Sequence, residues 1–80
     1  VPGRAQGSAL AVPVLRGLVP AVRTRVLHAW ARELGAAPAA LGHRHVRALD
    51  ALVTDWHGQG PVHLPGAIRV ARRQDALVRL

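Results

Sequence analysis

The stretch "TDWHGQGPVHLPG", residues 54–66, marks a change of secondary structure. Apolar residues recur at helical spacing before it and alternate with polar residues after Gly58, a pattern typical of strands. Five of the nine residues after His57 are glycine or proline, which punctuate regular structure. We therefore expect a helix end, a connection whose reversal Gly58 and Gly60 permit, and then the first strand of a small sheet.

Three strands are predicted after this point. They are "PVHL" (61–64), "AIRVARR" (67–73) and "ALVRL" (76–80), joined by turns at "PG" (65–66) and "QD" (74–75). Alternation places Val62, Leu64, Ile68 and Val70 on an apolar face. The opposite face is expected to carry His63, Arg69, Arg73 and Arg79. This pattern predicts an antiparallel meander with two hairpins and an arginine-lined outer face.

Three helical segments are predicted before the stretch. The first spans about 12–18, with Pro13 in its first turn and one side formed by Leu10, Val14, Leu15 and Leu18. The second begins at Pro20 and ends at Gly35, and the third spans about 43–57. Their apolar stripes contain Val26, Leu27, Trp30 and Leu34, then Val46, Leu49, Leu52, Val53 and Trp56.

Together these segments predict an α+β fold with two to three helices followed by a small three-stranded antiparallel meander. Residues 1–9 are expected to be a linker and residues 10–80 a single domain. We expect both Trp30 and Trp56 in the core, and a surface ion pair between Arg47 and Asp50. The longest apolar run, residues 8–14, is too short to span a membrane.

The charge of the chain is strongly positive. All eleven basic residues are arginines, against four acidic residues, which gives a formal net charge of +7. Arginine pairs with phosphate through a planar, five-donor guanidinium, so this balance is typical of a nucleic-acid binder. A GC-rich coding bias, with arginine in place of lysine, explains the same composition, and the composition by itself leaves both readings open.

No catalytic or metal site is predicted. His43 and His45 are two residues apart, so on a helix they point away from each other. His45 falls on the apolar side of its helix, where we expect a partly buried ring that is hydrogen-bonded to the backbone. His57 and His63 lack a third ligand nearby, and the hydroxyls of Ser8, Thr24 and Thr54 have no His–Asp partnership. We therefore expect no bound metal or cofactor and no active site in these 80 residues.

Two stretches carry a family resemblance. "HVRALDALVTDWHGQGPVHLPGAIRVARR" resembles the C-terminal region of the bacterial tRNA(Ile)-lysidine synthase family, particularly its actinobacterial form. "LVPAVRTRVLHAWARELG" resembles the helix that precedes this region, so the resemblance covers about residues 10–80. It implies enzymes that use ATP with magnesium to join lysine to the wobble cytidine of an isoleucine tRNA with a CAU anticodon.

In that family catalysis belongs to an N-terminal domain with an "SGGxDS" loop. No "SGG" occurs in this sequence, so no catalytic residue can be carried over. The resemblance implies a C-terminal domain that holds isoleucine tRNA for the catalytic domain of the same protein. We also expect a cytoplasmic protein, and the sequence leaves open whether it forms a homodimer.

The residues expected to contact RNA follow from charge and projected faces, not from a family motif. In the sheet they are Arg69, Arg72 and Arg73; on the helices they are Arg25, Arg32, Arg44 and Arg47. Because the chain lacks Phe and Tyr, we expect readout of shape and phosphates. A docking or dimerisation module and a winged-helix-like DNA-binding domain remain alternatives, and a stand-alone enzyme is the weakest.

Overall fold

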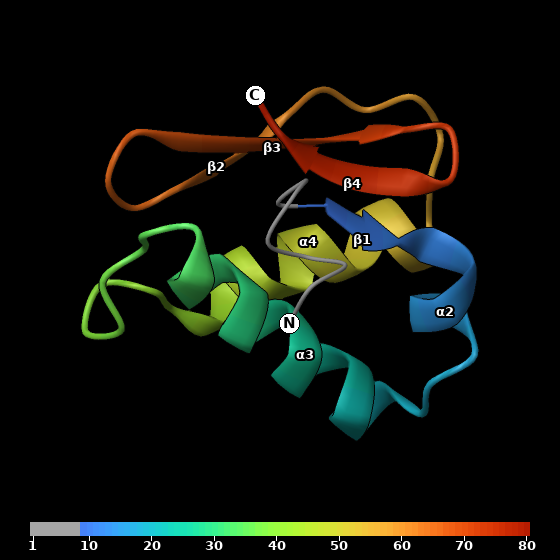
Figure 1. Ribbon diagram of the computed structural model, residues 1–80, viewed down its shortest axis with the longest axis horizontal. Helices are drawn as coiled ribbons and strands as arrows, with labels where there is room; N and C mark the ends of the chain where they lie inside the picture. Colours follow the sequence, from blue (N-terminus) through green and yellow to red (C-terminus); the bar gives the residue numbers. More distant parts are fainter. Residues whose placement is uncertain (1–8) are drawn as a thin grey trace.

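The computed structural model describes residues 9–80. It contains a four-stranded antiparallel sheet in the order β1-β4-β3-β2 and three helices, all on one face of that sheet (Figure 1). The elements are β1 (Ala9–Ala11), α2 (Val12–Arg16), α3 (Pro20–Glu33), α4 (His43–Thr54), β2 (Val62–Leu64), β3 (Ile68–Arg73) and β4 (Ala76–Arg79). The predicted α+β class is confirmed. The linker predicted for residues 1–9 lies outside the described residues except for Ala9, which belongs to β1.

The sheet has one strand more than predicted. Strand β1 pairs with β4, with Leu10 opposite Leu77 and Ala11 opposite Ala76. The sequence places Leu10 beside a helix, because three residues are too few to show an alternating pattern. Its strand conformation depends instead on hydrogen bonds from a strand at the other end of the chain, which no local pattern reveals.

The remaining strands confirm the predicted meander and its turns. Gly66 and Ala67 have positive φ angles of 89° and 59° between β2 and β3, and Gln74 has φ 57° between β3 and β4. Cross-strand partners share a face, so Leu64 and Ile68 both point toward the helices and are buried. His63 and Arg69 lie opposite each other on the outer face and are exposed.

The predicted outward placement of Arg79 is wrong. In the register of the sheet Arg79 lies opposite the fully buried Val70, so the two side chains share the helix-facing side. The Arg79 Nη1 atom donates to the carbonyl oxygen of Leu34 at 3.0 Å. Its aliphatic stem therefore lies at the margin of the core while its charged end closes the last turn before Gly35.

The first two helices begin where proline was expected to start them. Pro13 lies in the first turn of α2, and α3 begins at Pro20. Helix α2 ends at Arg16, two residues before the predicted end. Val14, which was expected on the apolar side of this helix, is 65% exposed. Val12 takes the buried position.

Helix α4 ends three residues before the predicted boundary. Asp55 leaves the helical conformation, and the Gln59 Nε2 atom donates to the Asp55 carbonyl oxygen at 3.2 Å. The backbone N–H of His57 donates in turn to Gln59 Oε1 at 2.8 Å. This closing turn leaves Trp56 outside the helix and 40% exposed, so its predicted core position is wrong.

The core lies between the sheet and the helices, and seventeen of the described residues are buried apolar members of it. Trp30 is its largest fully buried side chain, at 1% exposure, as predicted. A charged pair adjoins this core: Arg23 is 8% exposed, and its Nε atom lies 2.5 Å from Asp50 Oδ1. The surface pair predicted between Arg47 and Asp50 is therefore replaced by a half-buried pair between α3 and α4.

Between residues 9 and 80 no helix is long and apolar enough to cross a membrane. In the same range no group of three or more His, Asp or Glu side chains is arranged to hold a metal ion.

Candidate nucleic-acid interface

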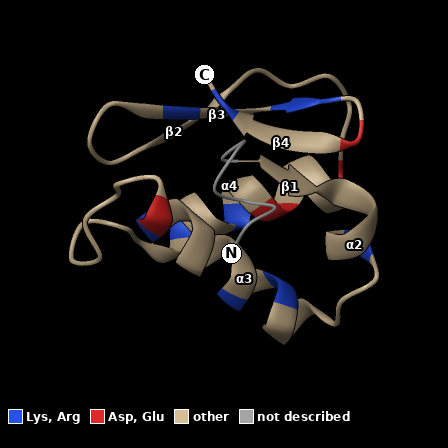
Figure 2. Cartoon of the chain, viewed as in Figure 1, with Lys and Arg blue, Asp and Glu red and all other residues tan. Residues whose placement is uncertain are grey.

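The seven arginines expected to contact RNA occupy five different surroundings. Arg25 and Arg47 lie together, Arg69 and Arg73 share the outer face of the sheet, Arg32 and Arg44 lie apart, and Arg72 is bonded inside the fold. Figure 2 shows basic residues on both the helical layer and the sheet. Charge alone therefore does not define one continuous binding face.

Arg25 and Arg47 come from different helices and line the same hollow. We name this hollow, of about 400 Å³, the α3–α4 groove; it is lined by Thr24, Arg25, His28, Leu41, Gly42, His43, Val46 and Arg47. On α3, His28 follows Arg25 by three residues; on α4, Arg47 follows His43 by four, so each pair shares a helix face. Two arginines and two histidines thus meet across the groove, and its lining includes no carboxylate.

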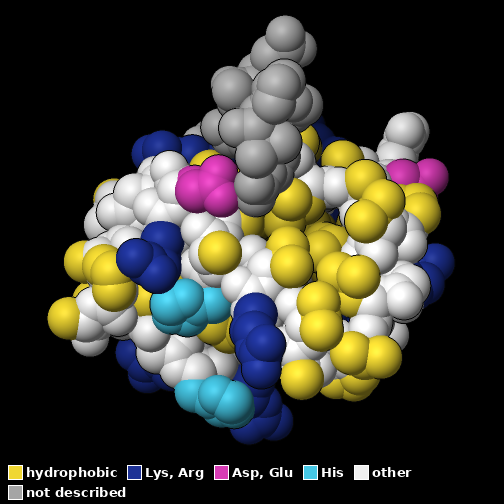
Figure 3. Space-filling view, turned by 60° about the horizontal axis from the view of Figure 1, so that its bottom comes forward, with side chains coloured by type: hydrophobic (Ala, Val, Ile, Leu, Met, Phe, Trp, Pro, Cys, Tyr) yellow, Lys and Arg dark blue, Asp and Glu magenta, His cyan; other side chains and the backbone are white. Residues whose placement is uncertain are grey.

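The surface beside this groove changes from basic to apolar. A second hollow, of about 460 Å³, is lined by Ala9, Leu10, Ala11, Val14, Leu15, Leu18 and Val26. In Figure 3 arginine and histidine side chains gather on one part of this side of the molecule, and a field of hydrophobic side chains covers another part.

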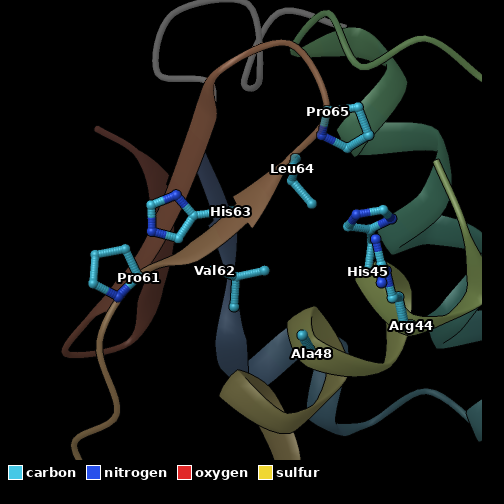
Figure 4. Close-up of a pocket in the computed structure, with 8 residues that line it drawn as sticks. All are labelled: Arg44, His45, Ala48, Pro61, Val62, His63, Leu64 and Pro65. Carbon is cyan, nitrogen blue, oxygen red and sulfur yellow. The ribbon is translucent and has the colours of Figure 1, made fainter. Parts of the chain in front are cut away.

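Arg44 lines a third hollow, on the other side of α4. We name it the α4–β2 groove; it measures about 590 Å³ and is lined by Arg44, His45, Ala48, Pro61, Val62, His63, Leu64 and Pro65 (Figure 4). The segment "HRHVR", residues 43–47, forms the first turn of α4 and separates the two grooves. His43 and Arg47 face one groove, and Arg44 and His45 face the other.

The two arginines on the outer face of the sheet are both exposed. Arg69 lies beside His63 of β2, and Arg73 lies opposite Ala76 of β4. None of the three helices between residues 9 and 80 covers this face (Figure 1). It is a second basic region, on the face of the sheet opposite the helices, and it adjoins the α4–β2 groove at His63.

The structure gives Arg32 and Arg72 different surroundings from those expected. Arg32 lines a separate hollow with Ala29, Glu33, Ala36 and Pro38, so it does not join the α3–α4 groove. Arg72 lies on the helix-facing side of the sheet, where its Nη1 donates to the Leu52 carbonyl at 3.0 Å and its Nε to the Gln74 carbonyl at 2.7 Å. Its guanidinium carbon also lies 5.4 Å from the centre of the Trp56 ring. Two of its five N–H donors are therefore used within the fold.

His45 confirms the expectation of a partly buried ring bonded to the backbone. Its Nδ1 atom accepts a hydrogen bond from the backbone N–H of Gly42 at 2.9 Å. Gly42 is the N-cap of α4 and has no side chain to accept from the first N–H groups, so His45 supplies half of a capping box. Sequence reasoning did not select His28 and His43 for the site, although the shared helix face of Arg25 and His28 was a usable signal.

Known proteins with similar sequences place the chain in a family. The family model described as the TilS substrate binding domain matches residues 10–78. The tRNA(Ile)-lysidine synthase of Salinispora tropica is 68% identical over 71 residues, which are 89% of this chain and 21% of that protein. The enzyme of the same name from Streptomyces coelicolor is 52% identical over 60 residues, 75% of this chain and 17% of that protein.

The chain spans about a fifth of the length of these relatives. No solved structure matches it. The family match covers nearly all of the residues that build the fold and both grooves. The chain therefore belongs to the TilS substrate-binding domain family.

Proposed function

We propose that this chain is the tRNA-binding part of a tRNA(Ile)-lysidine synthase, and that the α3–α4 groove binds phosphates of the tRNA backbone. Lysine is joined to the wobble cytidine of isoleucine tRNA elsewhere in the parent protein, in a catalytic domain that uses ATP and magnesium. In this proposal the chain itself carries no active site. Because the substrate is a tRNA, we expect the parent protein to act in the cytoplasm.

One observation carries the proposal: Arg25 and Arg47 come together across two helices, with His28 and His43 beside them and no carboxylate in the lining. Neither arginine makes a hydrogen bond or an ion pair with any residue of the range 9–80, and both residues are exposed. Guanidinium donors that carry no internal bond are well suited to bidentate contacts with phosphate oxygens. Such contacts fix the position of an RNA without reading its bases.

The relatives support the tRNA as the polyanion. Their names describe synthases that act on an isoleucine tRNA, and the family description assigns the matching segment to substrate binding. The comparisons do not favour a winged-helix DNA-binding domain or a docking module. A homodimer stays a prediction.

The test is a titration of the parent protein with isoleucine tRNA, a second tRNA and duplex DNA over a salt series. The Arg25→Ala/Arg47→Ala variant should bind isoleucine tRNA more weakly, and the slope of log affinity against log salt should fall by about two, one for each phosphate contact. Arg16→Ala, which removes an exposed arginine from α2 outside both grooves, is the control. Equal, steeply salt-dependent binding of all three nucleic acids would reduce the function to a nonspecific polyanion surface. Unchanged binding by the double variant would remove the groove from the interface.

A further inference from the structure

We propose that the α4–β2 groove is a pocket for one unpaired nucleotide of the bound RNA, with its phosphate on Arg44 and its base against the apolar wall formed by β2. This inference rests on the proposed function, because it assumes that the polyanion on the neighbouring α3–α4 groove is RNA. It adds contact with an unpaired base to the proposed contacts with backbone phosphates.

The shape and lining of the groove suit a flat, partly apolar group. Its volume of about 590 Å³ falls in the range of small-molecule sites, about 300–1,000 Å³. Val62 and Leu64 extend from β2 toward α4, and Pro61 and Pro65 stand at the two ends of the strand (Figure 4). Ala48 on the opposite wall is small and leaves the space open. A base can lie against the apolar side chains of this wall.

Besides His63, which lies on the outer face of β2, the groove has two polar side chains, and both are hydrogen-bond donors. The Arg44 side chain is exposed and makes no hydrogen bond or ion pair with any residue from 9 to 80. His45 adds a second donor: its Nδ1 accepts from the Gly42 N–H, so neutral His45 carries its proton on Nε2. Within residues 9–80 that nitrogen has no hydrogen-bond partner. The groove thus offers a guanidinium for a phosphate and an imidazole N–H for an acceptor on a base or ribose.

The charge of the groove selects against other occupants. No carboxylate lines it, and the chain as a whole has a formal net charge of +7, so an anionic ligand is favoured. An extended peptide added to the free edge of β2 would use backbone pairing and would leave Arg44 without a role. A nucleotide uses both the apolar wall and the two donors.

The position of the groove connects it with the proposed phosphate site. Arg44 and Arg47 are three residues apart on α4, so their Cβ atoms lie about 5–6 Å from each other. A single RNA strand that crosses the first turn of α4 therefore meets Arg47 on one side and Arg44 on the other. This geometry suits a segment in which a base has left the stack, since only unpaired bases can be splayed out into a pocket.

The experiment compares a single-stranded ribo-oligonucleotide with an RNA duplex of the same length, both titrated against the parent protein by fluorescence anisotropy. Arg44→Ala and the space-filling Ala48→Phe should each weaken the single strand about tenfold and change duplex affinity less than twofold. Ala21→Phe, an exposed position on α3 outside both grooves, is the matched control for adding a ring. Arg44→Lys keeps the charge and should restore only part of the affinity, because lysine lacks the bidentate fork.

The outcomes separate this inference from the proposed function. If Arg25→Ala/Arg47→Ala weakens both RNAs while the two groove variants leave the single strand unchanged, the tRNA-binding proposal stands and the nucleotide pocket is wrong. Equal losses on single strand and duplex in Arg44→Ala would make Arg44 one more phosphate contact and would also overturn the pocket. If Ala48→Phe lowers the thermal stability, the single-strand and duplex affinities of the Arg44 variants alone test the pocket. Failure of the wild-type protein to bind either RNA would contradict both proposals.

Discussion

Arg72 and Arg73 are neighbours in β3 and lie in opposite surroundings. The guanidinium of Arg72 turns toward the helices, donates to the carbonyls of Leu52 and Gln74, and covers the exposed Trp56. Arg73 points away from the helices into solvent and makes no hydrogen bond or ion pair within residues 9–80. The alternation of a strand assigns one arginine to stability and leaves the next available for a ligand.

Two further arginines resemble Arg72 in their role. Arg23 joins α3 to Asp50 of α4 and also donates to the Leu18 carbonyl at 3.0 Å, and Arg79 joins β4 to the end of α3. Three inward arginines therefore connect separate elements of a small domain. The arginines without such bonds connect nothing in the described chain, so the net charge overstates the positive charge that is free to bind a polyanion.

The largest effect is expected for Arg23→Met, which removes the charged end of an inward arginine and keeps much of its stem. The Asp50 carboxylate would lose its partner in a half-buried position, and the Leu18 carbonyl would lose a donor. We expect the free energy of unfolding to fall by about 2–4 kcal/mol, measured by urea denaturation of the chain. In a domain of this size the melting temperature should drop by at least about 8 °C.

A double-mutant cycle checks the cause of that loss. The variant Arg23→Met/Asp50→Asn should be more stable than the sum of the two single losses indicates, because it leaves no unpaired charge. A loss below about 0.5 kcal/mol for Arg23→Met would show that the pair is solvated and that Arg23 belongs with the surface arginines.

The next prediction compares how much two pairs of exposed arginines contribute to tRNA binding. Arg25→Ala/Arg47→Ala should weaken isoleucine tRNA binding about tenfold or more, whereas Arg69→Ala/Arg73→Ala, which removes equal charge from the outer sheet face, should weaken it less than threefold. Neither variant should change the melting temperature by more than about 2 °C, because these side chains make no internal bond. The reverse order of affinities would move the interface from the α3–α4 groove to the sheet.

The local features of the fold could be read from the sequence. Alternation in residues 61–73 predicted which side chains of β2 and β3 face the helices, and Pro20 with Gly35 predicted both ends of α3. These signals work because strand faces, first-turn prolines and glycines of positive φ each depend on a few adjacent residues. Gly35 has φ 117°, a conformation that few other residues tolerate.

Features that depend on distant partners could not be read in this way. Asp50 pairs with Arg23, which is 27 residues away, whereas the sequence offered only the neighbouring Arg47. Strand β1 exists because β4 supplies its hydrogen bonds. The candidate site shows the same limit: Arg25 and Arg47 were each selected for charge and helix face, but only the packing of α3 on α4 brings them to one groove.

A smaller loss of stability is expected for Arg72→Ala, which removes the inward-facing arginine of the pair Arg72 and Arg73. The variant loses two hydrogen bonds to carbonyl oxygens and the contact over the Trp56 ring, and both ends of that contact are partly exposed. We expect the free energy of unfolding to fall by about 1–2 kcal/mol, with no change in the salt slope of tRNA binding. Arg73→Ala is the matched control and should change stability by less than about 0.5 kcal/mol. A change in the salt slope for Arg72→Ala would show that Arg72 also contacts phosphate.

The smallest effect concerns His45, whose ring has one nitrogen bonded within the fold and the other available to a ligand. Its Nδ1 serves the fold by accepting the Gly42 N–H, and its Nε2 faces the α4–β2 groove. His45→Ala should lower the free energy of unfolding by about 0.5–1 kcal/mol through loss of the cap. His45→Gln should retain stability, because glutamine three residues after an N-cap can accept the same bond, yet it should still weaken the single-stranded oligonucleotide if Nε2 contacts a nucleotide. Equal stability of the alanine and glutamine variants would show that the bond to Gly42 contributes nothing, and the inward role of His45 would then be wrong.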